Sequence, residues 1–199
     1  MSEEKKEDTN EVLAFTFIKG DKLDLVPGTK KWAKHYARWM NDPEVRQYAR
    51  NMIPHSIEEV EKWHEPRDRE GAPKGIFMTI YHKADEKPIG VVGLGDINWF
   101  NRWANAFIQI DKNYWGKGVA TEATKLLLQY AFEEVNLNKV SGKVIIDNVG
   151  SWKVAEKLGF IYEGVLKDEF YVHGEYKDVK RYAFLKKDWL EMKGKKKSE

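Results

Sequence analysis

The feature that most constrains the fold is a glycine-containing loop that joins an alternating apolar segment to a long amphipathic one. Residues 104–110 carry Ala or Ile at every second position, which predicts a strand with one buried side. Residues 118–135 carry apolar side chains at helical spacing, and they form the best helix candidate of the chain. Strand, tight loop and helix in this order indicate a domain that mixes helices and strands.

The rest of the chain continues the same mixed pattern. We expect further helices at 30–40, 56–63 and 148–158, and further strands at 13–17, 23–25, 75–81, 88–97, 139–146, 160–170 and 177–185. Because no linker or internal repeat interrupts the pattern, residues 11–192 are predicted to form a single α+β, or mixed α/β, domain around one sheet. The charged segments 1–10 and 193–199 are expected to be disordered tails.

Composition excludes several classes of protein. The chain has no cysteine, so disulfides, thiolate zinc sites and a cysteine nucleophile are absent. Lys+Arg (34) and Asp+Glu (32) nearly balance, which argues against a dedicated nucleic-acid binder. The five histidines show no metal-binding spacing, and we expect no metal site. Nothing resembles a signal peptide or a membrane span, so the expected location is the cytoplasm.

The loop within Tyr114–Glu122 is the first candidate binding site. Gly116 and Gly118 permit a tight turn that points backbone N–H groups at a ligand, and the following helix start adds unpaired N–H groups. Together these groups favour a phosphate or pyrophosphate, and Lys117 adds a nearby positive charge. An ordinary glycine-containing junction of strand and helix remains the alternative.

A second polar segment, Asp147–Ser151, enters the next predicted helix. Asn148 is placed to cap that helix, which is an ordinary structural role. If the two helix starts lie side by side across a gap between their strands, the polar groups here would also hold an extended ligand.

Three motifs in order, YWGKGVATEA, DNVGSWKVAEKLGF and EGVLKDEFYVHGEYKDV, resemble the GNAT acetyltransferase superfamily. The most similar branch contains the ribosomal-protein N-terminal acetyltransferases and the spermidine acetyltransferases. The resemblance implies a mostly antiparallel central sheet with helices on both faces. It also implies a V-shaped splay between strands 104–110 and 139–146 in which acetyl-CoA lies.

The family's binding mode implies a set of CoA-contacting residues. The strand edge would pair with the pantetheine arm, the loop amides would hold the pyrophosphate, and the second helix start would contact the arm. These positions are Ile108, Gln109, Ile110, Trp115, Gly116, Lys117, Gly118, Val119, Ala120, Thr121, Asn148 and Ser151.

The catalytic groups depart from the common family pattern. The helix tyrosine that serves many members as the acid is replaced by Ala155, and we assign the thiolate donor to Ser151, which matches a serine of this branch. The strand glutamate of many members is replaced by Asn105, which cannot act as a base. Glu169 is the best replacement, and the alternative is that it is only a solvated carboxylate at a strand end. Asp96 and Glu163 are weaker candidates, and a water chain is the alternative to a carboxylate base.

The missing strand glutamate bears on the acceptor. An α-amine titrates at about 7.7–8.0 and a lysine amine at about 10.4, so an α-amine needs less help to lose its proton. The leading hypothesis is therefore an acetyl-CoA-dependent N-acetyltransferase acting on a protein N-terminal α-amine. A polyamine or aminoglycoside-like acceptor is the alternative, because carboxylates within 163–178 could attract a cation. A non-catalytic acetyl-CoA-binding module is the third.

The acceptor site would be lined by aromatic side chains and one carboxylate. In such folds the loop 98–103 and the first helices wall the acceptor site, so the predicted lining residues are Trp99, Phe100, Trp103, Glu169 and Tyr171. The sequence does not specify an oligomeric state, and a homodimer is suggested by family analogy alone.

Overall fold

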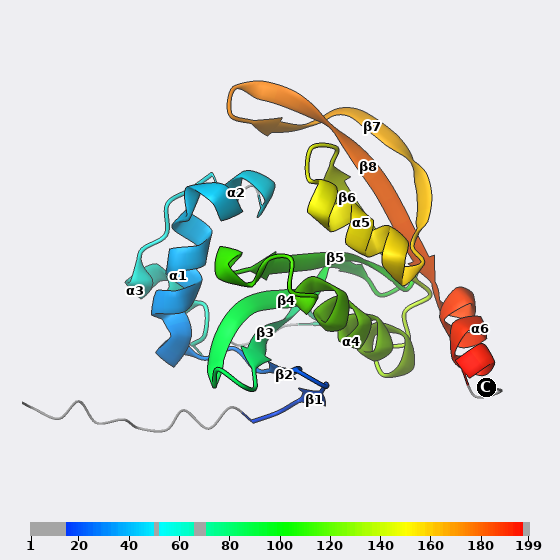
Figure 1. Ribbon diagram of the computed structural model, residues 1–199, viewed down its shortest axis with the longest axis horizontal. Coiled ribbons are helices and arrows are strands. Elements are labelled where there is room, and N and C mark those ends of the chain that lie inside the picture. Colours follow the sequence, from blue (N-terminus) through cyan, green and yellow to red (C-terminus); the bar gives the residue numbers. More distant parts are fainter. Residues whose placement is uncertain (1–14, 50–51, 66–70, 197–199) are drawn as a thin grey trace, which may run out of the picture.

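The computed structural model describes residues 15–49, 52–65 and 71–196. Its eight strands form one open sheet in the order β1-β2-β3-β4-β5-β6-β8-β7 (Figure 1). The strands are β1 (Ile18–Lys19), β2 (Leu23–Val26), β3 (Ile76–His82), β4 (Lys87–Asn98), β5 (Trp103–Ile110), β6 (Lys139–Ile145), β7 (Ile161–Val172) and β8 (Glu175–Leu185). All neighbouring strands are antiparallel except β5 and β6.

Six α-helices accompany the sheet in the part of the chain that is described. They are α1 (Ala33–Asn41), α2 (Pro43–Ala49), α3 (Ile57–Lys62), α4 (Val119–Glu133), α5 (Val149–Leu158) and α6 (Lys186–Lys196), with short 3-10 turns at Lys30–Trp32 and Lys112–Tyr114. The expected α+β, mixed α/β fold with one mostly antiparallel sheet is confirmed.

Helices cover both faces of the sheet, as expected. Successive residues of a strand point to opposite faces. On β3, Ile80 joins the core that α4 builds with Ala123 and Leu127, whereas the next residue, Tyr81, packs on the cluster of α1 and α3. This part of the sheet therefore lies between two layers of helices.

The structure departs from the predicted elements at three places. The first strand is β1 at Ile18–Lys19 rather than 13–17, of which 13 and 14 lie outside the described residues. Helix α2 was not predicted, although Asp42 and Pro43 mark its start: the Asp42 carboxylate accepts from the Glu44 N–H at 2.9 Å, and proline suits the first helical position.

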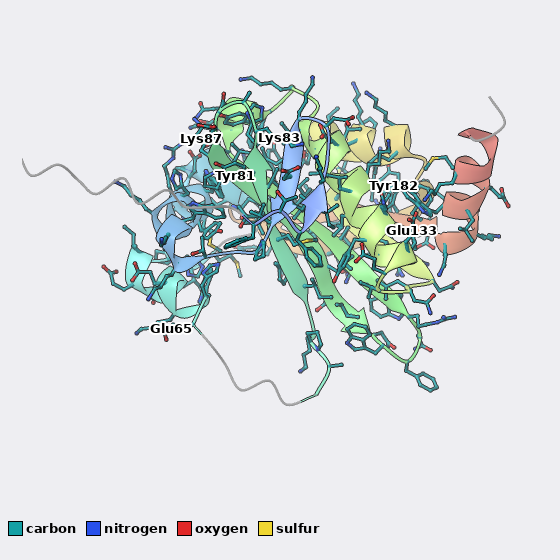
Figure 2. The ribbon with its side chains drawn as sticks, turned by 90° about the horizontal axis from the view of Figure 1, so that it is seen from below. Glu65, Tyr81, Lys83, Lys87, Glu133 and Tyr182 are labelled. Carbon is teal, nitrogen blue, oxygen red and sulfur yellow. The ribbon has the colours of Figure 1, made fainter. Side chains whose placement is uncertain are left out.

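The third departure is α6, which extends through Lys196 where a basic tail was expected from 193. Glu133, at the end of α4, secures this helix (Figure 2): it accepts from the Trp189 indole at 2.8 Å and pairs with Lys193 at 2.6 Å. Residues 1–10 of the other predicted tail lie outside the described residues.

Replacement of Leu127 by Ala should destabilise the domain by about 2–5 kcal/mol, because Leu127 is fully buried and the change leaves a cavity under α4. Leu190→Ala, on an exposed position of α6, is the matched control and should have little effect. Urea unfolding of both variants measures the difference, and equal stabilities would contradict this account of the core.

Candidate active site

The two halves of the sheet part between β5 and β6. These strands pair only at Trp103–Asn105 with Lys139–Ser141. Beyond Asn105, β5 continues along β4 to Ile110, while β6 continues along β8 to Ile145. A cavity of about 740 Å³ opens in this wedge, and its walls are residues 106–110 of β5 and 142–145 of β6.

The glycine loop forms the end of the wedge next to α4. Gly116 and Gly118 have φ of 73° and 82°, a left-handed conformation that favours glycine. Gly118 is the N-cap of α4 and offers no side chain to the first N–H groups of the helix. A Cβ added to either glycine would meet open space, so a ligand has room to approach these amides. This geometry fits an anionic group such as a pyrophosphate.

Asp111 holds the end of β5 and the start of this loop in place. Its carboxylate accepts hydrogen bonds from Arg38 Nη2 at 2.7 Å and from the Trp39 indole at 3.0 Å, both on α1, and from the Asn113 N–H at 3.0 Å. Burial by itself raises the pKa of Asp111, but these hydrogen bonds and the Arg38 charge outweigh it and hold the pKa below its ordinary value. The carboxylate thus stays charged and ties α1 to the loop.

Most of the predicted CoA-contacting residues line the cavity. They are Ile108, Gln109, Ile110, Trp115, Gly116, Gly118, Val119, Ala120, Thr121, Asn148 and Ser151. Lys117 does not: its Nζ lies 5.1 Å from the centroid of the Tyr114 ring. The Trp115 indole donates to the Ile110 carbonyl at 2.9 Å, which folds the loop back onto the end of β5.

Asn148 and Ser151 have separable roles. The Asn148 side chain accepts from the Ser151 N–H at 3.2 Å, so Asn148 caps α5 and Ser151 contributes only its backbone to that cap. The Ser151 hydroxyl, which lines the cavity, makes no hydrogen bond to any residue in the described ranges. It is therefore free to donate to a ligand.

Ala155 stands on α5 where many family members have a tyrosine, and its small side chain lines the cavity. Tyr182 of β8, labelled in Figure 2, also lines the cavity and donates to Glu156 Oε1 at 2.8 Å. Burial, together with that carboxylate, raises the pKa of Tyr182 to about 12. Tyr182 is thus a poor substitute for the missing acid.

The structure gives Glu169 a partner that the sequence did not reveal. Its carboxylate pairs with Lys143 Nζ at 2.5 Å, and Glu169 does not line the cavity, whereas Lys143 does. Tyr171 packs against Tyr176 at the tip of the β7–β8 hairpin, with ring centroids 5.1 Å apart, and also lies outside the cavity lining. Neither residue is placed against the wedge as the sequence predicted.

The aromatic loop 99–103 also lies away from the cavity. It connects β4 to β5 at the end of β5 opposite to the glycine loop. Phe100 is 95% exposed, and the Trp99 indole donates to the Pro73 carbonyl at 2.8 Å. Trp99 and Phe100 therefore lie outside the proposed acceptor site.

Several cavity residues were missed by sequence reasoning. Val45 and Tyr48 come from the unpredicted α2, and Lys153 and Lys157 come from α5. The lysines add positive charge to a cavity that already carries an anion-binding helix start. Among the residues that the structure describes, no cluster of His, Asp or Glu could hold a metal ion, and no helix could span a membrane.

Comparison with known proteins identifies the family. The sequence profile of the acetyltransferase (GNAT) domain matches residues 22–161. The chain belongs to the GNAT acetyltransferase family. The match confirms the expected fold, and it makes the chain an N-acetyltransferase with acetyl-CoA as its cosubstrate.

Relatives within this family fall in the branch that the motifs indicated. The chain is 32% identical to a spermidine N(1)-acetyltransferase of Vibrio cholerae over 150 residues, covering 75% of this chain and 85% of that protein. It is 38% identical to YdaF of Bacillus subtilis, provisionally a ribosomal N-acetyltransferase, over 100 residues, covering 50% of this chain and 55% of that protein.

A solved structure from the same branch of the family is also similar to this chain. The spermidine N-acetyltransferase of Vibrio cholerae in complex with CoA and spermine superimposes with a TM-score of 0.75 at 27% identity. The superposition covers 86% of this chain and 99% of that one.

Replacement of Gly118 by Val should weaken CoA binding by about tenfold or more. This corresponds to a loss of about 1.4 kcal/mol in binding free energy. Valine would place its branched side chain where the loop amides are open, and a left-handed non-glycine residue costs roughly 1–2 kcal/mol. Calorimetric titration with CoA measures the change, and far-UV circular dichroism reports folding.

Gly174→Val is the matched control for strain, because Gly174 has a φ of 86° and an equally open Cβ position, but lies at the hairpin tip. Unchanged CoA affinity in a folded Gly118→Val variant, or an equal loss in both variants, would contradict the assignment of the loop.

Proposed function

We propose that this N-acetyltransferase acts on a polyamine or a related small amine rather than on a protein N-terminus. This reverses the leading hypothesis from the sequence. The observation that carries the proposal is the match to the Vibrio cholerae spermidine N(1)-acetyltransferase, which extends over 85% of that protein. The match to YdaF, which favours the other acceptor, extends over 55% of that protein.

The missing strand glutamate does not decide the acceptor, because Asp96 on the neighbouring strand supplies a carboxylate beside Asn105. The carboxylates of residues 163–178 do not decide it either. Glu163 pairs with Lys139 and Arg181, and Asp178 pairs with Lys167, so these carboxylates are already neutralised.

In the proposed reaction the wedge holds acetyl-CoA between β5 and β6. The loop amides and the start of α4 hold the pyrophosphate, and the pantetheine arm lies along the unpaired edge of β5. The nitrogen lone pair of the neutral amine attacks the thioester carbonyl, and the C–S bond breaks. The Ser151 hydroxyl is the proposed donor to the leaving thiolate.

The acceptor is tested by measuring acetyl transfer from acetyl-CoA to spermidine, spermine and a panel of peptides with free N-termini. The proposal expects a higher kcat/KM for the polyamines than for every peptide. Mass spectrometry should find one added acetyl group on the polyamine. Preferred acetylation of a peptide would restore the N-terminal hypothesis, and CoA binding without any transfer would support a non-catalytic module.

Ser151→Ala should lower kcat by about 10²–10⁴-fold if the hydroxyl protonates the thiolate, with a smaller effect on KM. The cap of α5 should survive, because it uses the Ser151 backbone N–H rather than the hydroxyl. The melting temperature should therefore stay close to that of the wild type. A full kcat in this variant would remove Ser151 from the chemistry.

Asn148→Ala is the informative companion variant. It removes the side chain that caps α5 and should cost about 1 kcal/mol of stability. The two variants separate the structural role of this helix start from its chemical role.

A further inference from the structure

Many GNAT members carry a glutamate on the strand where this chain has Asn105. A carboxylate on the neighbouring strand can take the role of that glutamate. Resting on the proposed function, we propose that Asp96 is the carboxylate that accepts the proton from the acceptor amine, and that Asn105 holds it in position. Asp96 belongs to β4, the strand next to β5, and the replacement is therefore made across a strand pair.

Asn105 lies at the apex of the wedge. It pairs with Ser141 as the last residue at which β5 contacts β6, and the strands part immediately after it. Phe107, two residues on and on the same face of β5, lines the cavity. Asn105 and Asp96 do not themselves line the cavity, but Phe107 extends it along the face of β5 on which the Asn105 side chain stands.

A β-bulge directs Asp96 toward this apex. Gly95 pairs with Asn105, but the register then shifts, and pairing resumes only at Asn98 with Trp103. Asp96 adopts a φ of 50° within the bulge, and Asn105 Nδ2 donates to Asp96 Oδ2 at 3.0 Å. Bulges re-aim side chains and are frequent beside active sites.

Asp96 differs from the other candidate carboxylates in having no cationic partner in the described part of the chain. Glu169 pairs with Lys143, and Glu163 pairs with both Lys139 and Arg181. The Lys139 hydrogen bond and nearby charges hold the pKa of Glu163 below its ordinary value. The Asn105 amide is neutral and occupies Oδ2, so Oδ1 of Asp96 remains available to an amine.

The surroundings of Asp96 suit an amine on an alkyl chain. Phe77 and Phe107, from the strands on either side of β4, meet over Gly93 with ring centroids 5.8 Å apart. A Cβ on Gly93 would lie 2.6 Å from the Phe77 ring, so glycine is required there. Phe77 remains 52% exposed, and Trp103 stands on the same face of β5 as Asn105. This apolar surface beside a single carboxylate is matched to methylene groups that end in an amine.

The proton balance is complete without another co-reactant. The amine nitrogen becomes positively charged as it bonds to the carbonyl carbon, and this makes its N–H acidic. Asp96 takes that proton while the C–S bond breaks and its electron pair leaves on sulfur. Ser151 or solvent protonates the thiolate, and Asp96, which is exposed, returns its proton to water.

The experiment measures kcat, the KM for acetyl-CoA and the pH–rate profile of Asp96→Asn, using whichever amine the wild type acetylates fastest. We expect kcat to fall by about 10²–10⁴-fold, with an unchanged KM for acetyl-CoA. The rate of the variant should recover toward that of the wild type at high pH, because free neutral amine accumulates and depends less on a carboxylate to lose its proton. Asparagine can still accept from Asn105, so the melting temperature should not change.

Asn105→Glu in the Asp96→Asn background should restore activity, because it returns a carboxylate to the apex from the other strand. Glu86→Gln is the control: Glu86 is also exposed with a φ of 50°, but lies in the β3–β4 turn, and its removal should change nothing.

A kcat for Asp96→Asn within twofold of the wild type would overturn the inference, as would a loss that Asn105→Glu does not restore. A wild type that acetylates peptides but no polyamine would overturn the proposed acceptor while leaving the test of Asp96 intact.

Discussion

The parting of β5 from β6 after Asn105 is the constraint on which the rest of the site depends. A parallel pair that stops after three residues leaves backbone groups of two strands without partners in the sheet. Buried or partly buried polar groups of this kind favour a ligand that can pair with them. The pantetheine arm of CoA carries amides that can pair with these strands, and we therefore propose the break in the sheet as its binding site.

The elements around the wedge are arranged to keep it open. Asp111 secures the end of β5 to α1, and Glu122 of α4 accepts from the N–H groups of Lys22 and Leu23 at 2.9 and 3.2 Å, which fixes α4 against β2. The glycines at 116 and 118 then bring the chain from β5 into α4 with its first amides facing the wedge. Helices α1, α3 and α4 pack on the strands next to the wedge, and these contacts position the loop without any contact from the ligand.

The sequence predicted the parts of this arrangement that local patterns encode. Apolar alternation located β5, helical spacing located α4, and the glycines between them marked the loop for which we propose anion binding. Asn148 was correctly assigned as a cap. Helix α2 was missed because its seven residues show little periodicity, although Asp42 and Pro43 mark its start.

Contacts between distant residues could not be predicted in the same way. The pair of Lys143 with Glu169 depends on how β6 and β7 are ordered around β8, which no local pattern states. The contact of Asp96 with Asn105 depends on a one-sided shift in register within a hairpin, and Gly95 alone does not specify it. The aromatic loop 98–103 was expected at the acceptor site by analogy with similar folds, whereas Trp99 and Phe100 lie at the end of β5 opposite to the glycine loop.

A crystal structure of the complex with CoA tests the central claim most directly. The account predicts the pyrophosphate against the amides at the start of α4, with the pantetheine arm between residues 106–110 of β5 and 142–145 of β6, and the sulfur near the apex at Asn105. A CoA molecule bound outside the wedge, or a wedge that closes by continued pairing of β5 with β6, would contradict it.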